Sequence, residues 1–288
     1  TWDDDDGPWS VLDPLFGSLS PSRLLLADRM WAQYVLAVRE RLPDADVGLA
    51  SEVLSPLRRI KDDRELGALR AAGQAADAAM RDVRTLGADA VGMTEAELTG
   101  FVEERLAAHG GTGVAFETIV AAGPNGADPH HTGGDRVIGA GDPVVLDFGT
   151  RVDAYPSDQT RTVVFDGEPS AEFRRVHDAV REAQSQGVAA VEPGASAGAV
   201  DRAAREVIEA AGYAEAFVHR TGHGVGLDVH EEPDIVAGSE TELEPGMVFS
   251  VEPGVYLTDR FGVRIEDLVV VTEDGAERLN HTDRRWRG

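Results

Sequence analysis

The amino-acid sequence predicts an α+β protein in which two similar halves each contribute two helices followed by two strands. Three observations support this prediction: apolar residues switch between helical and strand spacing, short motifs recur at a nearly constant offset, and acidic residues lie within the strand-like runs. We therefore expect a pseudo-twofold sandwich with antiparallel strands inside and helices outside, preceded by a short β-α-β segment.

Residues 1–55 form this first segment. Short apolar runs predict two buried strands around one helix, at residues 24–27, 47–50 and 29–41. A second domain is expected to follow and to cover residues 56–288.

Four helices are predicted in the second domain, at about residues 62–86, 94–110, 171–191 and 196–212. Thr94 is followed three residues later by Glu97, the pattern of a capping box at a helix start. The second and fourth helices begin alike, with Gly92-Met-Thr94 in one and Gly194-Ala-Ser196 in the other, an offset of 102 residues. Each reaches a terminal glycine 16 residues after the Thr or Ser. The two helical pairs therefore look like copies of one unit.

The acidic residues of the predicted strands repeat as well. Asp147 and Glu252 are 105 residues apart, and Asp158 and Glu266 are 108 residues apart. Each half thus supplies two carboxylates, which we expect to meet on the pseudo-twofold axis. His223 has no counterpart in the first half and should bias one of two metal sites over the other.

Five side chains of the metal-ligand type each lie in a separate local motif. The motifs are Leu146-Asp-Phe-Gly149, Ser157-Asp-Gln-Thr-Arg161, Gly222-His-Gly-Val-Gly226, Val251-Glu-Pro-Gly254 and Arg264-Ile-Glu-Asp267, and the ligands are Asp147, Asp158, His223, Glu252 and Glu266. Such an oxygen-rich set suits two divalent ions that share bridging carboxylates, with water left to react. The set predicts a metal-dependent hydrolase.

The order Asp, Asp, His, Glu, Glu, at spacings of 11, 65, 29 and 14 residues, resembles that of the pita-bread metallopeptidases. This family includes methionine aminopeptidase, aminopeptidase P and prolidase, and the segments 222–230 and 263–267 are most similar to its Xaa-Pro branch. The resemblance covers about residues 56–275, and Pro56 with the stretch 57–65 looks like the family's linker into the catalytic domain. It implies a pita-bread catalytic domain over 56–288 and a truncated amino-terminal domain over 1–55.

The resemblance also implies a role for each ligand. Asp147 would bind the first metal, and Asp158 and Glu266 would bridge both. His223 and Glu252 would bind the second metal, and Glu252 would also accept a proton from the attacking water. The neighbours of Asp158 at 160–162 are expected to fix its carboxylate.

Three further histidines and one arginine complete the candidate site. By resemblance, His130, His219 and His230 line the substrate pocket. His230 would stabilise the tetrahedral intermediate or pass a proton to the leaving nitrogen. Arg264 lies two residues before Glu266 and so on the same strand face, where it could pair with a carboxylate or a substrate group.

The implied activity is hydrolysis of the Xaa-Pro bond at the amino terminus of peptides or dipeptides, as in aminopeptidase P or prolidase, by a homodimer. Mn²⁺ or Co²⁺ suits the ligand set, and Zn²⁺ is an alternative. Two other readings are a non-catalytic pita-bread binding protein and a creatinase-type C–N hydrolase without metal. Binding proteins of this kind typically lose ligands, so the five retained ligands oppose the first interpretation. They also oppose the second, because four unneutralised acids around one cavity would repel each other.

The composition is strongly acidic, with 52 acidic and 27 basic residues and a net charge of −25. This charge disfavours a nucleic-acid partner and predicts adaptation to high salt, where carboxylate repulsion is screened. Lys61 is the only lysine, and there is no cysteine for disulfides or thiolate metal sites. No apolar run reaches membrane-spanning length and no signal segment opens the chain, so a cytoplasmic location is expected.

Overall fold

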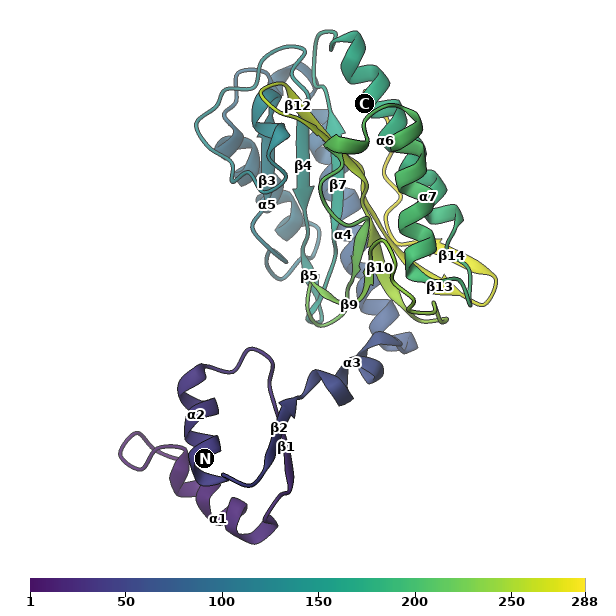
Figure 1. Ribbon diagram of the computed structural model, residues 1–288. Coiled ribbons are helices and arrows are strands. Elements are labelled where there is room, and N and C mark those ends of the chain that lie inside the picture. The colour runs from purple at the N-terminus through teal and green to yellow at the C-terminus, as the bar shows by residue number, and fades with distance from the viewer. Residues whose placement is uncertain (288) are drawn as a thin grey trace. The chain divides into compact units, whose positions relative to one another are not determined.

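The structure is a computed structural model that describes residues 1–287. It contains two compact units, Thr1–Arg58 and the remainder from Arg59 onward. Figure 1 colours the first unit purple to dark blue and the second blue to yellow. Each unit is described by itself below. Within the described residues, no helix combines the length and apolarity that crossing a membrane requires.

The first unit contains the predicted β-α-β arrangement. Its elements are α1 (Trp9–Leu19), β1 (Arg23–Leu26), α2 (Ala32–Arg41), β2 (Asp46–Leu49) and α3 (Ser51–Arg59), and β1 pairs with β2 in parallel. Helix α1 was not predicted. Pro56, in the expected linker, lies inside α3. The start of α3 is held by Asp28, whose carboxylate accepts the Ser51 N–H at 3.1 Å.

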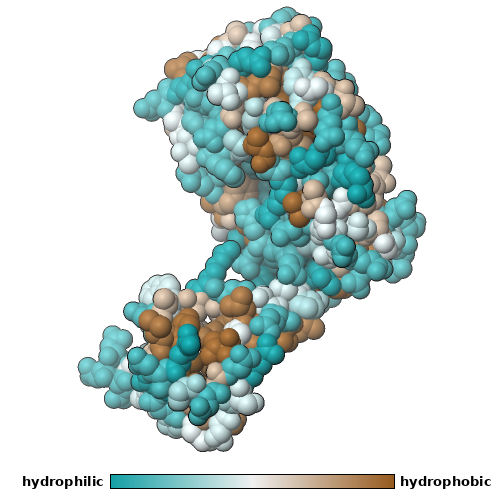
Figure 2. Space-filling view, viewed as in Figure 1, coloured by the Kyte–Doolittle hydropathy of each residue, from teal (hydrophilic) through white to brown (hydrophobic). Residues whose placement is uncertain are grey.

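The surface of the first unit carries several exposed apolar side chains, which Figure 2 shows as brown groups among the teal of hydrophilic residues. The most exposed are Leu19, Trp31, Leu36 and Leu57. Leu26 and Val38 are the buried apolar residues of this unit. Its core is therefore small compared with that of the second unit.

The second unit contains the four predicted helices, α4 (Asp63–Thr85), α5 (Glu95–Ala108), α6 (Ala171–Ala189) and α7 (Ala197–Ala210). Each boundary lies within two residues of the predicted one. Short 3₁₀ helices lie at η1 (Gly87–Ala90), η2 (Gly123–Ala127) and η3 (Ala214–Ala216). The predicted capping box is present, since the Thr94 hydroxyl accepts the Glu97 N–H at 3.1 Å and the Glu97 carboxylate accepts the Thr94 N–H at 2.8 Å.

The strands of the second unit pair antiparallel, as predicted. They are β3 (Ile119–Ala122), β4 (Val144–Phe148), β5 (Arg151–Val152), β6 (Tyr155–Pro156), β7 (Gln159–Val163), β8 (Gly222–Gly224), β9 (Glu231–Ile235), β10 (Val248–Val251), β11 (Gly254–Leu257), β12 (Phe261–Arg264), β13 (Asp267–Thr272) and β14 (Gly275–Arg278). One sheet has the order β3-β4-β7, another β14-β13-β10-β8-β9, and β5-β6 and β11-β12 form hairpins. In Figure 1, β4 and β7 run between α5 and the pair α6 and α7.

The topology confirms the internal repeat. Strand β4 pairs with β7 around the hairpin β5-β6, and β10 pairs with β13 around the hairpin β11-β12. The helix-start residues also correspond, since Thr94 bridges Val137 and Ser196 bridges Glu242. Gly92 has φ +99° and Gly194 φ +85°, a region that favours glycine. Equivalent motifs thus make equivalent turns.

The hydrophobic core explains where the acidic strand residues point. Val144, Leu146 and Phe148 of β4 are packed in one core cluster with residues of α4 and α5. Side chains alternate along a strand, so Asp147 points to the opposite face. It remains only 9% exposed, because that face lines the interior of the unit.

One charged residue at the start of the second unit is buried in an unusual way. The side chain of Lys61, the only lysine, is 0% exposed, and its Nζ lies 2.7 Å from Glu231 Oε1. Its main-chain N–H donates to the Gly246 carbonyl oxygen at 2.9 Å. The segment before α4 is therefore tied to the turn before β10 and to the start of β9.

Candidate active site

A cavity of about 240 Å³ in the second unit brings all the candidate site residues together. It is lined by Asp147, Asp158, His223, Glu252, Glu266, His130, His219, His230 and Arg264. Five further lining residues were not predicted, namely Phe116, Ile119, Pro129, Arg220 and Val229. The apolar members of this second group form part of the cavity wall.

The four carboxylates come from equivalent places in the two halves. Asp147 lies in β4, and Glu252 directly follows β10. Asp158 directly precedes β7, and Glu266 directly precedes β13. Because β4 pairs with β7 and β10 pairs with β13, each half delivers its two acids from neighbouring strand ends.

His223 is oriented with one ring nitrogen toward these acids. Its Nδ1 donates to the Gly224 carbonyl oxygen at 3.2 Å, which leaves the lone pair on Nε2. Nε2 lies 3.3 Å from Glu252 Oε1 and 3.7 Å from Asp158 Oδ2. Burial lowers the pKa of His223 to about 3, so the ring is neutral near pH 7. A lone pair facing carboxylate oxygens favours a cation between them.

The glycine before His223 is required for this placement. A Cβ on Gly222 would lie 1.8 Å from the Ser250 carbonyl oxygen. Strand β8 can therefore approach β10 closely only with glycine at this position. The same contact brings the Ser250 hydroxyl to the His223 N–H, which it accepts at 3.0 Å, and to Glu252 Oε1, to which it donates at 3.0 Å.

The electrostatics of the carboxylates indicate a site that needs cations. Burial, followed by the charges of the neighbouring acids, raises the pKa of Asp158 and of Glu266 well above the usual range. Burial raises the pKa of Glu252 to about 7. Asp147 Oδ1 and Glu266 Oε1 are buried without a hydrogen-bond partner. Unpaired buried acceptors of this kind are costly unless a cation compensates them.

Three of the five residues already have metal-site spacing. One potential ligand atom from each of Asp158, His223 and Glu266 lies within 4.8 Å of the other two. Together with the orphaned oxygens and the neutral imidazole, this spacing shows that the residues present fit divalent metal ions.

The side chains of residues 160–162, which were expected to fix Asp158, have other partners. The Thr160 hydroxyl donates to Glu266 Oε2 at 2.6 Å. The Thr162 hydroxyl donates to the Arg264 carbonyl oxygen at 2.9 Å. Both threonines therefore connect β7 to the second half, because β12 and β13 lie next to this strand.

Arg264 pairs with a carboxylate and continues into a chain of hydrogen bonds. Its Nη2 lies 2.5 Å from Asp147 Oδ2, and its Nη1 donates to the Tyr256 hydroxyl at 2.7 Å. His219 Nδ1 donates to the Arg220 carbonyl oxygen at 2.7 Å, and burial lowers the pKa of His219 to about 4. The neutral ring therefore accepts at Nε2, from the Tyr256 hydroxyl at 2.8 Å. Both ring nitrogens of His219 are engaged, which favours a positioning role over proton transfer.

Tyr256 was missed in the sequence, although a signal was present. Glu252, Gly254 and Tyr256 alternate along the chain, and alternate strand residues share a face. A Cβ on Gly254 would lie 2.6 Å from the Tyr256 hydroxyl, so the glycine makes room for this ring.

His130 and His230 lie at the exposed side of the cavity. The His230 ring stands at 70° to the His223 ring, with centroids 4.2 Å apart. The loop that carries His130 is held by the buried Glu95 carboxylate, which accepts the Gly134 N–H at 3.1 Å and the His131 Nε2–H at 2.8 Å. The catalytic roles of both histidines remain predictions.

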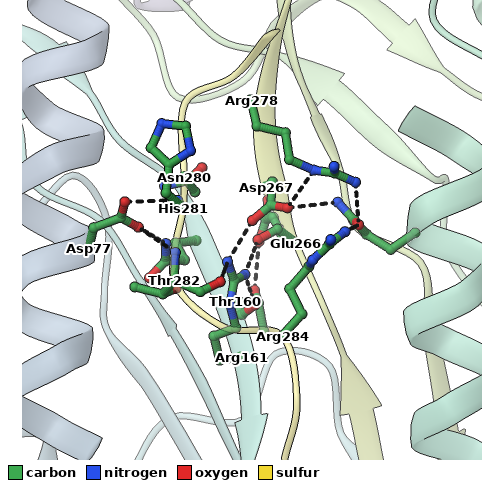
Figure 3. Close-up of polar contacts among 12 residues, drawn as sticks. Asp77, Thr160, Arg161, Glu266, Asp267, Arg278, Asn280, His281, Thr282 and Arg284 are labelled. Carbon is green, nitrogen blue, oxygen red and sulfur yellow. Dashed lines mark hydrogen bonds and ion pairs between the residues drawn. The ribbon is translucent and has the colours of Figure 1, made fainter. Parts of the chain in front are cut away.

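Behind the cavity, Arg161 holds the main chain of Glu266 in place (Figure 3). Its Nη1 donates to the Glu266 carbonyl oxygen at 2.5 Å, and its Nη2 lies 2.6 Å from Asp267 Oδ1. Its other donors reach the carbonyl oxygens of Thr160, Thr282 and Asp283. Arg161 is 1% exposed, and its contacts join β7, β13 and the carboxy-terminal segment inside the unit.

Comparison with known proteins agrees with this geometry. The model of metallopeptidase family M24 matches residues 67–273. The probable dipeptidase PepE of Mycobacterium tuberculosis is 44% identical over 281 residues, 97% of this chain and 73% of that protein. The Xaa-Pro dipeptidase of Pyrococcus furiosus is 41% identical over 233 residues, 81% of this chain and 66% of that protein.

Solved structures extend the likeness to the fold. The crystal structure of dipeptidase PepE from Mycobacterium ulcerans matches with a TM-score of 0.91 at 44% identity, covering 99% of this chain and 75% of that one. The recombinant prolidase from Thermococcus sibiricus matches with a TM-score of 0.94 at 40% identity, covering 99% of this chain and 77% of that one. These matches confirm the predicted pita-bread fold. By sequence and by fold, the chain belongs to metallopeptidase family M24.

Proposed function

We propose that this protein is a dinuclear metal-dependent peptidase that hydrolyses the bond between a first residue and a following proline. The observation that carries the proposal is the convergence of the five ligand-type side chains, three histidines and an arginine on one cavity. The names of the relatives, dipeptidase and Xaa-Pro dipeptidase, support the same substrate class.

The proposed ligands of two divalent ions are Asp147, Asp158, His223, Glu252 and Glu266. Bound there, the ions would neutralise the carboxylates, polarise the peptide carbonyl and acidify a water molecule. The oxygen-rich set favours Mn²⁺ or Co²⁺, with Zn²⁺ as the alternative. The orphaned oxygens of Asp147 and Glu266 support this assignment most directly.

The remaining residues would handle protons and substrate. Glu252 would accept the proton of the attacking water at a carboxylate oxygen, while the Ser250 hydroxyl fixes the orientation of that carboxylate. His230, at the exposed side of the cavity, would donate to the tetrahedral oxygen or to the leaving imino nitrogen. The apolar wall that includes Phe116, Ile119 and Val229 would receive the proline ring.

Hydrolysis of Ala-Pro and Ala-Pro-Ala at high salt, with Mn²⁺ and then with a chelator, tests the proposal. Cleavage that the chelator abolishes is the expected result, and repetition at low salt tests the predicted salt adaptation. Absence of cleavage with two metals bound would point to another substrate, and absence of both cleavage and metal would favour a binding protein. Light scattering after size exclusion tests the proposed homodimer.

Metal removal also has an expected effect on stability. A ligand at 100 times its dissociation constant stabilises the folded state by about 2.7 kcal/mol, so Mn²⁺ should raise the melting temperature and chelation should lower it. Glu266→Gln should reduce this shift. Glu277→Gln is the matched control, because that carboxylate is half exposed and bound to Arg70 outside the cavity. An equal loss of the metal-induced shift in both variants would contradict the ligand assignment.

A further inference from the structure

The charges of the cavity raise the question of how it would accept an anionic substrate end. Four carboxylates line it, and two divalent ions would balance their charge. The positive side chains of the lining, apart from the histidines, are Arg220 and Arg264. Each of these two arginines carries a fixed positive charge that suits a free peptide carboxylate inside this acidic protein.

Arg264 is already committed within the protein. It is 3% exposed, and each of its three side-chain nitrogens has a partner. It contacts the carboxylate of Asp147 and the hydroxyl of Tyr256 at 2.5 and 2.7 Å. Reorienting it toward a substrate would break this chain and remove its contact with the buried carboxylate of Asp147.

Arg220 is differently placed. Its side chain is 36% exposed and is paired with Asp234, which is 56% exposed. Asp234 lies opposite His223 in the β8-β9 pairing, so the ion pair borders the metal-ligand histidine. Such exposed pairs contribute little net stability, and replacing Asp234 with another carboxylate therefore costs little.

Arg220 lines the same cavity as Glu252 and His223. Its guanidinium therefore lies beside the groups that are proposed to react. Its planar fork is suited to bidentate binding of a carboxylate.

We propose that Arg220 binds the carboxyl-terminal carboxylate of a dipeptide, in exchange for Asp234. The inference rests on the proposed Xaa-Pro peptidase function and deepens it, because it makes a free carboxylate on the proline part of the recognised ligand. Dipeptides with a carboxyl-terminal proline are then favoured over longer peptides. Asp234 is an internal competitor for the same guanidinium.

Steady-state kinetics on Ala-Pro, Ala-Pro amide and Ala-Pro-Ala test this inference. Loss of a charge-assisted contact predicts that Arg220→Met raises KM for Ala-Pro on the order of 10-fold, while kcat changes little. Kinetics on Ala-Pro amide should barely change, because the amide carries no carboxylate. Arg220→Lys should restore part of the affinity, and Asp234→Asn should lower KM for Ala-Pro by removing the competitor.

Arg260→Met is the matched control, because Arg260 is likewise exposed and paired with a carboxylate, Glu172, but does not line the cavity. It should leave KM for Ala-Pro unchanged. An equal rise in KM for Ala-Pro and its amide in Arg220→Met would overturn the proposal, as would equally efficient cleavage of both by the parent protein.

Calorimetric measurement of Ala-Pro binding to the metal-loaded protein distinguishes failure of the proposed function from failure of this inference. Binding without cleavage would contradict the peptidase proposal, and the same variants would then test Arg220 through affinity alone. Equal affinity of the parent protein and Arg220→Met for Ala-Pro would overturn the inference in that case. Absence of both binding and cleavage would overturn both proposals.

Discussion

In both halves of the second unit, the residue after a candidate metal ligand forms an amide–carboxylate hydrogen bond with a helix. The amide and the carboxylate have exchanged places between the two halves. In the first half, Gln159 follows Asp158 and donates to Asp77 on α4 at 2.7 Å. In the second half, Asp267 follows Glu266 and accepts from Gln184 on α6 at 3.0 Å. The strand residues are 108 apart and the helix residues 107 apart, so the pairs are equivalent with amide and acid reversed.

This exchange decides which of the two carboxylates is paired with arginine side chains. Asp267, the strand acid, also forms ion pairs with Arg161 Nη2 at 2.6 Å and with Arg278 Nε at 3.1 Å (Figure 3). Asp77, the helix acid, instead accepts the main-chain N–H of His281 at 2.8 Å. The repeat thus conserves the amide–carboxylate contact. The carboxylate of the second half is paired with arginines, whereas that of the first half has neutral hydrogen-bond donors.

The largest expected effect comes from removing the acid of each pair. Asp267→Asn leaves Arg161 buried without a counter-charge, which should lower the free energy of unfolding by about 3–5 kcal/mol. Asp77→Asn loses hydrogen bonds to neutral donors only and should cost about 1–3 kcal/mol. Urea unfolding of both variants measures the difference, and equal losses would show that the reversal has no energetic consequence.

A second difference between the halves is sensitive to pH. With the same offset of 107, the place of Arg70 on α4 is taken by His177 on α6, which is 1% exposed. Burial lowers the pKa of His177 to about 3 from 6.5, so the unfolded chain binds a proton that the folded protein excludes. The contribution of His177 to stability is therefore fully present above pH 6.5 and is lost as the pH falls toward 3.

His177→Leu should remove this dependence. Relative to the variant, the parent protein should lose about 2 kcal/mol between pH 8 and pH 5. Arg70→Met is the control, because no side chain changes its charge at that position in this range. Urea unfolding at several pH values gives the comparison, and parallel pH profiles for parent and His177→Leu would refute the assignment.

The smallest expected effect comes from two glycines that occupy equivalent turns in the two halves. Gly92 and Gly194 both have positive φ, and a Cβ at either position has at least 3.8 Å of space. Alanine should therefore cost about 1–2 kcal/mol at each, from backbone conformation alone. Thermal unfolding of Gly92→Ala and Gly194→Ala should give similar shifts. Clearly different shifts would mean that the two turns are not energetically equivalent.

The features that could be predicted from the sequence are those with a local signal. Thr94 and Ser196 begin helices because their hydroxyls cap the first turn, and both were found at their predicted places. Asp147 stood out because an acid in the apolar run 144–148 needs a partner. Helix boundaries and the carboxylate positions of the repeat follow from such patterns.

The features that could not be predicted depend on register between distant strands. Thr160 supports Glu266 and not Asp158 because of how β7 meets the second half, 106 residues later in the chain. The contact of Arg264 with Asp147 joins residues 117 apart. Arg220 carries no motif of its own, and only the folded cavity places it beside the site. Local patterns contain no information on these separations.

The burial of Lys61 has a practical consequence for handling this protein. The only ε-amine of the chain is 0% exposed at its side chain and bound to Glu231, so reagents directed at lysine will find it shielded. Amine-reactive dyes, biotin esters and aldehyde surfaces should therefore not react at this side chain in the folded protein. Since the sequence has no cysteine, one introduced cysteine on the surface would provide a unique attachment point.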